Sequence, residues 1–248
     1  KRDIKLILIN INLRIGTIMK KITIAILMLL GSFSMASAEL GVKLGASLNI
    51  GVFHATGTDL DASSPTTGAA GGAATTQSED ATGVAGFTSF FIEKDLSFLP
   101  GPFARFSIGY DYVNEDMAGE STETRSSLDS ANTNTDKTNT VKIAFENMST
   151  TYVTFNVTEN LYVKAGSISV DLVTKENLGT GGSYGDESLG GDMAGIGMQQ
   201  EFDNGLFVRA EGTLIDIDNP TAQTSGDHTI TIKNIEGASA RLSIGKSF

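Results

Sequence analysis

The sequence of 248 residues contains no cysteine and no tryptophan, and it has only four prolines and two histidines. The absence of cysteine excludes disulfide bonds and thiolate metal sites. Helical periodicity is also missing after the amino-terminal segment, where no window repeats apolar residues at intervals of three and four. Many windows instead repeat them at every second position, which predicts an all-β protein.

The amino-terminal segment indicates export. Lys20 and Lys21 precede the apolar run 22–30, and an Ala-Ser-Ala motif ends at Ala38. This order is typical of a secretory signal peptide, and the run is too short to span a bilayer, although a membrane anchor is the alternative interpretation. We interpret residues 1–18 as translated upstream sequence, 19–38 as the signal peptide and 39–248 as the mature domain.

Alternation predicts about eight strands in the mature domain. Every second residue between Leu40 and Val52 is apolar, and small or polar residues lie between them. The predicted strands are near 40–52, 83–94, 103–113, 140–157, 161–173, 193–202, 206–215 and 229–248. Long polar connections at 56–82, 114–139, 174–192 and 216–228 alternate with short ones at 95–102, 158–160 and 203–205. Long external loops and short periplasmic turns are typical of a membrane-spanning, antiparallel up-and-down β-barrel.

Alternation by itself fits both a soluble barrel, with its apolar face inside, and a membrane barrel, with that face outside. The export signal, the unequal connections, the tyrosines at a strand end and the terminal Phe248 favour lipid outside and charges inside. The predicted lumen charges are Lys43, Arg105, Asp111, Lys142, Glu146, Glu201, Arg209, Glu211 and Arg241. Glu201 and Arg209 are predicted to be diagonal neighbours.

The connection 203–205 tests this orientation. A two-residue Asn-Gly turn would direct Arg209 and Glu211 toward lipid, at a cost of a few kcal/mol for each charge. A three-residue turn with Gly205 in the left-handed conformation pairs Phe202 with Leu206 and directs both charges into the lumen. The sequence therefore predicts the three-residue turn.

The last strand carries a recognisable pattern, because Ala240, Leu242, Ile244 and Phe248 share one parity. A terminal aromatic residue with apolar residues at alternate positions resembles the carboxyl-terminal signal of outer-membrane barrels, which the assembly machinery of that family recognises. Lys246 departs from the pattern, although near the interface its amine can reach water. The whole mature chain resembles the small eight-stranded barrels of the OmpA and opacity-protein kind, without a periplasmic domain.

The resemblance implies insertion in the bacterial outer membrane and a role in adhesion, envelope integrity or limited solute passage. An eight-stranded barrel is just wide enough for side chains to fill it. The lumen charges could therefore neutralise each other and plug the barrel, or they could line a narrow porin-like channel, since many lumen positions are glycine or serine. The leading prediction is a non-enzymatic barrel with a structural or surface-interaction role.

Charge bears on the partners. Residues 1–38 hold six of the 18 basic residues and one of the 29 acids, so the mature domain has 28 acids against 12 bases. The four long connections hold 17 of these acids and three bases. Such a surface repels nucleic acid and attracts cations. Solvated loops, or contact with outer-membrane lipid and lipopolysaccharide through divalent cations, both fit this composition, and the oligomeric state stays open.

His54 and His228 are predicted at the outer ends of the first and last strands, which are neighbours in a closed barrel. With Asp227 they could form a metal site or the His-Asp pair of a hydrolase. Two solvated histidines are the simpler interpretation, so we expect neither a catalytic residue, nor a metal site, nor a cofactor.

Overall fold

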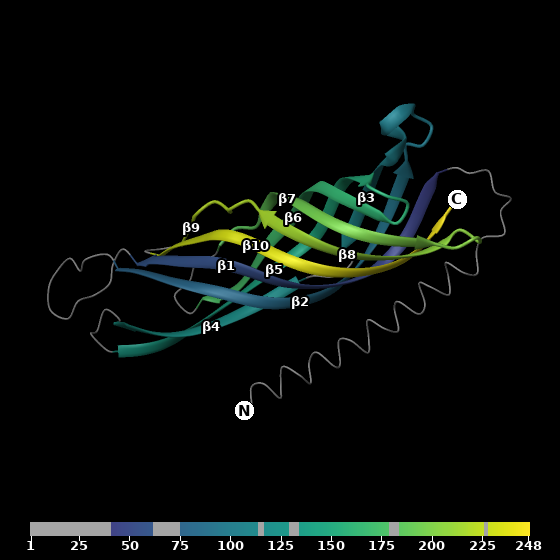
Figure 1. Ribbon diagram of the computed structural model, residues 1–248. Coiled ribbons are helices and arrows are strands. Elements are labelled where there is room, and N and C mark those ends of the chain that lie inside the picture. The colour runs from purple at the N-terminus through teal and green to yellow at the C-terminus, as the bar shows by residue number, and fades with distance from the viewer. Residues whose placement is uncertain (1–40, 62–74, 114–116, 129–133, 179–183, 226–227) are drawn as a thin grey trace.

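The computed structural model describes residues 41–61, 75–113, 117–128, 134–178, 184–225 and 228–248 (Figure 1). Within these ranges it contains ten strands and one short 3-10 helix, η1 (Gly101–Arg105). The strands are β1 (Val42–Asp61), β2 (Thr75–Asp95), β3 (Phe106–Val113), β4 (Met117–Leu128), β5 (Asn134–Asn156), β6 (Leu161–Leu178), β7 (Glu187–Glu201), β8 (Leu206–Ile217), β9 (Gln223–Ser225) and β10 (His228–Ser247). In the described residues, no helix has the length and apolar character needed to cross a bilayer.

Eight of these strands close into an antiparallel up-and-down barrel. Their order is β1-β2-β3-β5-β6-β7-β8-β10, and β10 pairs with β1 to complete the circle. β4 pairs with the outer part of β5, and the short β9 pairs with β10. The predicted fold class and the number of barrel strands are therefore confirmed.

Side chains alternate between the inside and the outside of the barrel. In β8, Phe207, Arg209 and Glu211 are buried, whereas Val208 and Leu214 are exposed. The same alternation on the other strands produces an exposed apolar band around the barrel. It includes Leu48, Ile50, Val52, Phe90, Ile92, Ile108, Tyr110, Val153, Val163, Ile196, Met198, Val208, Leu214 and Leu242. The predicted parity, with charges inside and apolar residues outside, is confirmed for β8.

The connection between β7 and β8 is the predicted three-residue turn. The Phe202 N–H donates to the Leu206 carbonyl at 2.8 Å, and the Gly205 N–H donates to the Phe202 carbonyl at 2.8 Å. Gly205 has a φ of 78°, which glycine adopts without steric cost. This turn fixes the register that directs Arg209 and Glu211 inward.

The long connections differ from the prediction, because strands occupy much of them. β1 and β2 stay paired out to Asp61 opposite Thr75, and β4 and β5 stay paired out to Leu128 opposite Asn134. These segments have little apolar alternation, so their strand character was not visible as a pattern. They form because each continues the hydrogen-bond ladder of a barrel strand beside it. In Figure 1 the outer parts of β1, β2 and β4 extend toward the left of the view.

The barrel has two halves with different interiors. The turn-side half lies next to the connections 96–105, 157–160 and 202–205 and contains charged side chains. The hairpin-side half contains an apolar cluster of Phe87, Val113, Met148, Ile168, Val170, Leu172, Leu189, Ile215, Ile217 and Ile235. On β6 the outward neighbours of this cluster, Ser167 and Ser169, are exposed. On β6 the hairpin-side half therefore has an apolar interior and a polar exterior.

Candidate functional site: the charged lumen

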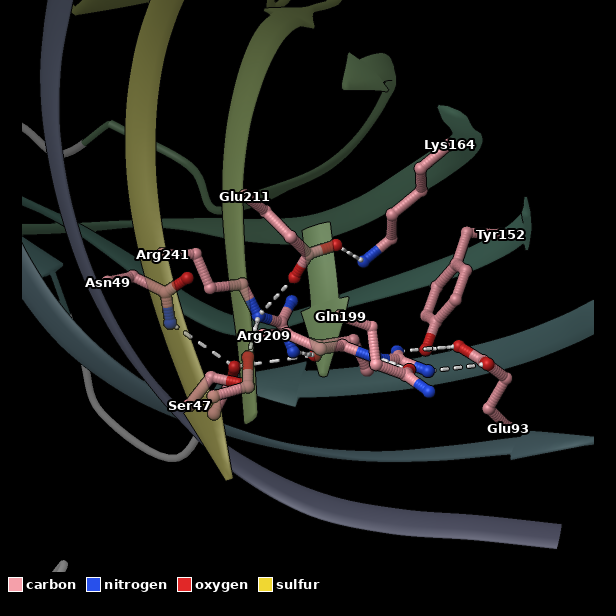
Figure 2. Close-up of polar contacts among 12 residues, drawn as sticks. Ser47, Asn49, Glu93, Tyr152, Lys164, Gln199, Arg209, Glu211 and Arg241 are labelled. Carbon is pink, nitrogen blue, oxygen red and sulfur yellow. Dashed lines mark hydrogen bonds and ion pairs between the residues drawn. The ribbon is translucent and has the colours of Figure 1, made fainter. Parts of the chain in front are cut away.

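The turn-side half of the lumen holds eight charged side chains that form two ion-paired groups of four, together called the lumen network here. It has four basic and four acidic members: Lys43, Lys164, Arg209, Arg241, Glu93, Asp95, Asp111 and Glu211. All except Asp95 are buried. Equal numbers of opposite charges make the network neutral as a whole, and most of its members are drawn in Figure 2.

One part of the network joins β8 to β2. The Arg209 guanidinium donates to both carboxylate oxygens of Glu93, at 2.9 and 2.8 Å, and its Nε donates to Gln199 at 2.6 Å. The Tyr152 hydroxyl donates to Glu93 at 3.2 Å. β8 and β2 are not neighbours in the barrel, so this bidentate pair crosses the lumen. Such two-point contacts are among the stronger hydrogen bonds in proteins.

A second part joins β10, β3, β8 and β6. Arg241 pairs with Asp111 on β3 and lies 3.1 Å from a Glu211 carboxylate oxygen. The other Glu211 oxygen accepts from the Lys164 amine at 3.3 Å. Figure 2 shows Glu211 between the two basic side chains. The Arg241 Nε also donates to Ser47 at 2.8 Å, so the guanidinium is held from three sides.

The third part lies toward the turns. The Lys43 amine is 3.1 Å from Asp95 and 3.9 Å from Glu93. The Ser107 hydroxyl donates to Asp95 at 2.6 Å. Because the Asp95 side chain is 21% exposed, it marks the mouth of the lumen on this side.

Aromatic rings fill the space between the charges. The Arg209 guanidinium lies 4.8 Å from the Phe207 ring centre and 5.2 Å from that of Phe91, and the Lys164 amine lies 3.8 Å from the Tyr152 ring centre. Rings also lie directly over the small lumen residues, so that an added Cβ would overlap them. The pairs are Gly45 with Phe91, Gly109 with Tyr152, Gly197 with Tyr162 and Gly245 with Phe207. The room that glycine leaves in the lumen is thus occupied by side chains.

Five of the nine predicted lumen charges belong to this network: Lys43, Asp111, Arg209, Glu211 and Arg241. Glu201 pairs with Phe207 and is therefore diagonal to Arg209, as predicted. Its side chain is exposed and accepts from Gln199, and Gln199 accepts from Arg209. The side chain of Lys142 lies outside the described residues, so its prediction stays untested.

Two predicted lumen residues are placed elsewhere. Arg105 belongs to η1 rather than to a strand; it is exposed and donates to the Val157 carbonyl. Glu146 pairs with Asp171, which lies on the outward side of β6. A register shift in β5, where Asn147 has a φ of 53°, reverses the alternation there. Neither the helical turn nor the bulge has a marked signal in the sequence.

Three network members were missed in the sequence. Glu93 and Asp95 lie on the inward parity of β2, but Phe91 on that parity and Phe90 on the other make both faces look apolar. Lys164 lies on β6 with Ile168 and other inward apolar residues of the hairpin-side half. The sequence shows Lys164 only as a single charge between apolar neighbours. Because a charged side chain is rarely buried without a partner, such a position indicates an ion pair inside the protein.

The two histidines are not brought together. His54 pairs with Glu236, whereas His228 pairs with Asp61, seven residues farther along β1. Seven residues of strand separate them by roughly 23 Å. The predicted proximity of His54 and His228 is therefore wrong, and Asp227 lies outside the described residues.

The last strand has the predicted orientation. Ala240 and Leu242 are exposed on the outside of the barrel, Ile244 shares their parity, and the Phe248 N–H donates to the Val42 carbonyl at 2.9 Å. The Lys246 amine lies 5.7 Å from the Phe248 ring centre. The pattern that resembles an assembly signal is thus presented on the outer surface, and its recognition stays a prediction.

No protein-family profile and no curated protein matches the sequence. Among solved structures, the chain is similar to Ail, the attachment invasion locus protein of Yersinia pestis (11% identity, TM-score 0.32, 82% of this chain and 98% of that chain). It is also similar to the outer membrane protease OmpT of Escherichia coli (10%, 0.41, 87% and 99%) and to Neisserial surface protein A (12%, 0.33, 82% and 97%). The strand pairings of the chain itself, rather than these distant similarities, establish the barrel.

Proposed function

We propose that this protein is a non-enzymatic outer-membrane β-barrel with a closed lumen, and that its role is carried by the hairpin-side half facing the cell exterior. The exposed apolar band supports the membrane location. A continuous band of this kind around a soluble protein would far exceed the apolar patches that monomers tolerate in water. Exposed Phe98, Phe103 and Phe202 at the turn end supply the aromatic residues typical of a membrane interface.

The lumen network is the observation that supports a closed lumen. Arg209 with Glu93 and Arg241 with Asp111 each join strands that are not neighbours, so they span the interior. Removing one partner of a buried pair is strongly unfavourable, which keeps the pairs together. Aromatic rings lie over the small lumen residues Gly45, Gly109, Gly197 and Gly245. A solute would have to break several buried ion pairs to pass.

Contact with membrane lipid and lipopolysaccharide is part of the same proposal. Glu236, Asp216 and Asp192 pair in a row across β10, β8 and β7 on the exposed side of the barrel. A row of carboxylates repels anionic phosphate groups. Any contact with lipopolysaccharide at this level is therefore expected to depend on cations.

Planar-bilayer recording of the refolded full chain tests the closed lumen. We expect no steady openings above the lipid baseline. The double variant Arg209→Ser with Glu93→Ser is the matched control, because it removes a pair that crosses the lumen and leaves neither charge unpaired. It should open a conducting path. Steady openings of the unmodified protein would refute the proposal in favour of a narrow channel.

A further inference from the structure

An open seam separates β2 from β4 in the hairpin-side half. β2 pairs with β1 along its whole length, but it pairs with β3 only over residues 89–95. In the described parts of the chain, β4 pairs with β5 alone, and no strand pairs with the other edge of β2 over residues 75–85. The side chains of residues 76–84 are exposed. β2 therefore presents an edge that is about twice as long as a typical strand and has no partner strand in the described residues.

The backbone groups at this edge follow from the turn-end hydrogen bonds. The Asp95 N–H donates to the Gly41 carbonyl beside β1, and the Leu96 N–H donates to the Phe106 carbonyl of β3. Successive residues of an antiparallel strand direct their backbone groups to alternate sides. Since the register of β1 and β2 is unbroken, the even-numbered residues face the open side. They are Thr76, Ser78, Asp80, Thr82 and Val84. Unpaired edge groups are a template for another strand.

The charge of the residues around the open edge of β2 indicates which kind of strand it would bind. Residues 75–88 contain Glu79 and Asp80, the paired residues 56–61 of β1 contain Asp59 and Asp61, and neither stretch has a basic residue. An added strand with lysine or arginine at alternate positions would hydrogen-bond to the backbone groups and bring its cations close to this acidic stretch. We propose that residues 75–85 of β2 bind an extended basic segment of a partner polypeptide by strand addition. This inference rests on the proposed external role of the hairpin-side half.

The test uses the full chain refolded in detergent and a labelled twelve-residue peptide in which lysine alternates with threonine. Ser78→Pro removes an edge N–H and leaves the pairing with β1, which uses odd-numbered residues. Loss of one such hydrogen bond and disturbance of its neighbours should weaken peptide binding about tenfold, measured by fluorescence anisotropy. The matched control Ser78→Ala keeps the N–H and should bind as the unmodified protein does.

Two peptide controls separate strand addition from simple attraction of a cation to an acidic surface. A peptide with glutamate in place of lysine should not bind. A lysine peptide whose alternate amides are N-methylated along the edge that faces β2 should bind weakly, because those amides can no longer donate to β2. Equal binding to the Ser78→Pro and Ser78→Ala variants, or no binding of the lysine peptide, would overturn the inference. A conducting barrel that still binds the peptide at this edge would refute only the closed lumen.

Discussion

The turn-side and hairpin-side halves of the barrel are built from the same strands with opposite polarity. On β8, Arg209 and Glu211 lie inside and Val208 lies outside, whereas farther along the strand Ile215 and Ile217 lie inside and Asp216 lies outside. A side chain is stable where its surroundings match its polarity. For the proposed outer-membrane location, this difference corresponds to lipid around the turn-side half and water around the hairpin-side half. The change from Leu214 to Asp216 marks the boundary on this strand.

The largest loss of stability is expected when a charge in the turn-side lumen is left without its partner. Arg209→Met leaves the Glu93 carboxylate buried, with Lys43 at 3.9 Å and the Tyr152 hydroxyl as its remaining contacts. We expect the free energy of unfolding to fall by about 3–5 kcal/mol. Urea unfolding in the presence of lipid vesicles measures it. Arg209→Met combined with Glu93→Met removes both charges and should restore most of the loss; an equal loss in the double variant would show that the pair is not what stabilises this region.

A charge on the outside should distinguish the two halves with a smaller effect. Ile196→Arg puts a cation in the middle of the apolar band on β7, where its side chain is 55% exposed. We expect a loss of about 2–4 kcal/mol in the same measurement. Ser169→Arg, on the outward side of β6 in the hairpin-side half, is the matched control and should change stability by less than about 0.5 kcal/mol. Equal losses would contradict the boundary between lipid and water.

The smallest effect is expected inside the hairpin-side half. Ile168→Val removes one methyl group from the apolar cluster, in which Ile168 is 3% exposed. We expect a loss of about 1 kcal/mol. The side chain of the neighbouring Ser167 points outward, so Ser167→Ala should leave the free energy of unfolding nearly unchanged. A larger loss for Ser167→Ala than for Ile168→Val would mean that the two faces of β6 are assigned the wrong way round.

Particular residues show how far the sequence predicted the site. Arg209, Glu211 and Arg241 could be assigned to the lumen because clean alternation and a short turn fix their parity. Arg105 and Glu146 were assigned wrongly because a 3-10 turn and a bulge change the parity locally, and neither depends on apolar pattern. Glu93 was missed because phenylalanines occupy both faces of β2.

The sequence by itself determined the all-β class, the eight barrel strands, the unequal connections and the outward apolar face. Each of these follows from the order of residues along one strand or across one turn. The tertiary structure alone decided which charges meet, because Arg209 with Glu93 and Arg241 with Asp111 join strands that become close only when the barrel closes. It also decided that β2 keeps an open edge, since that depends on where β3 ends and which neighbour β4 takes.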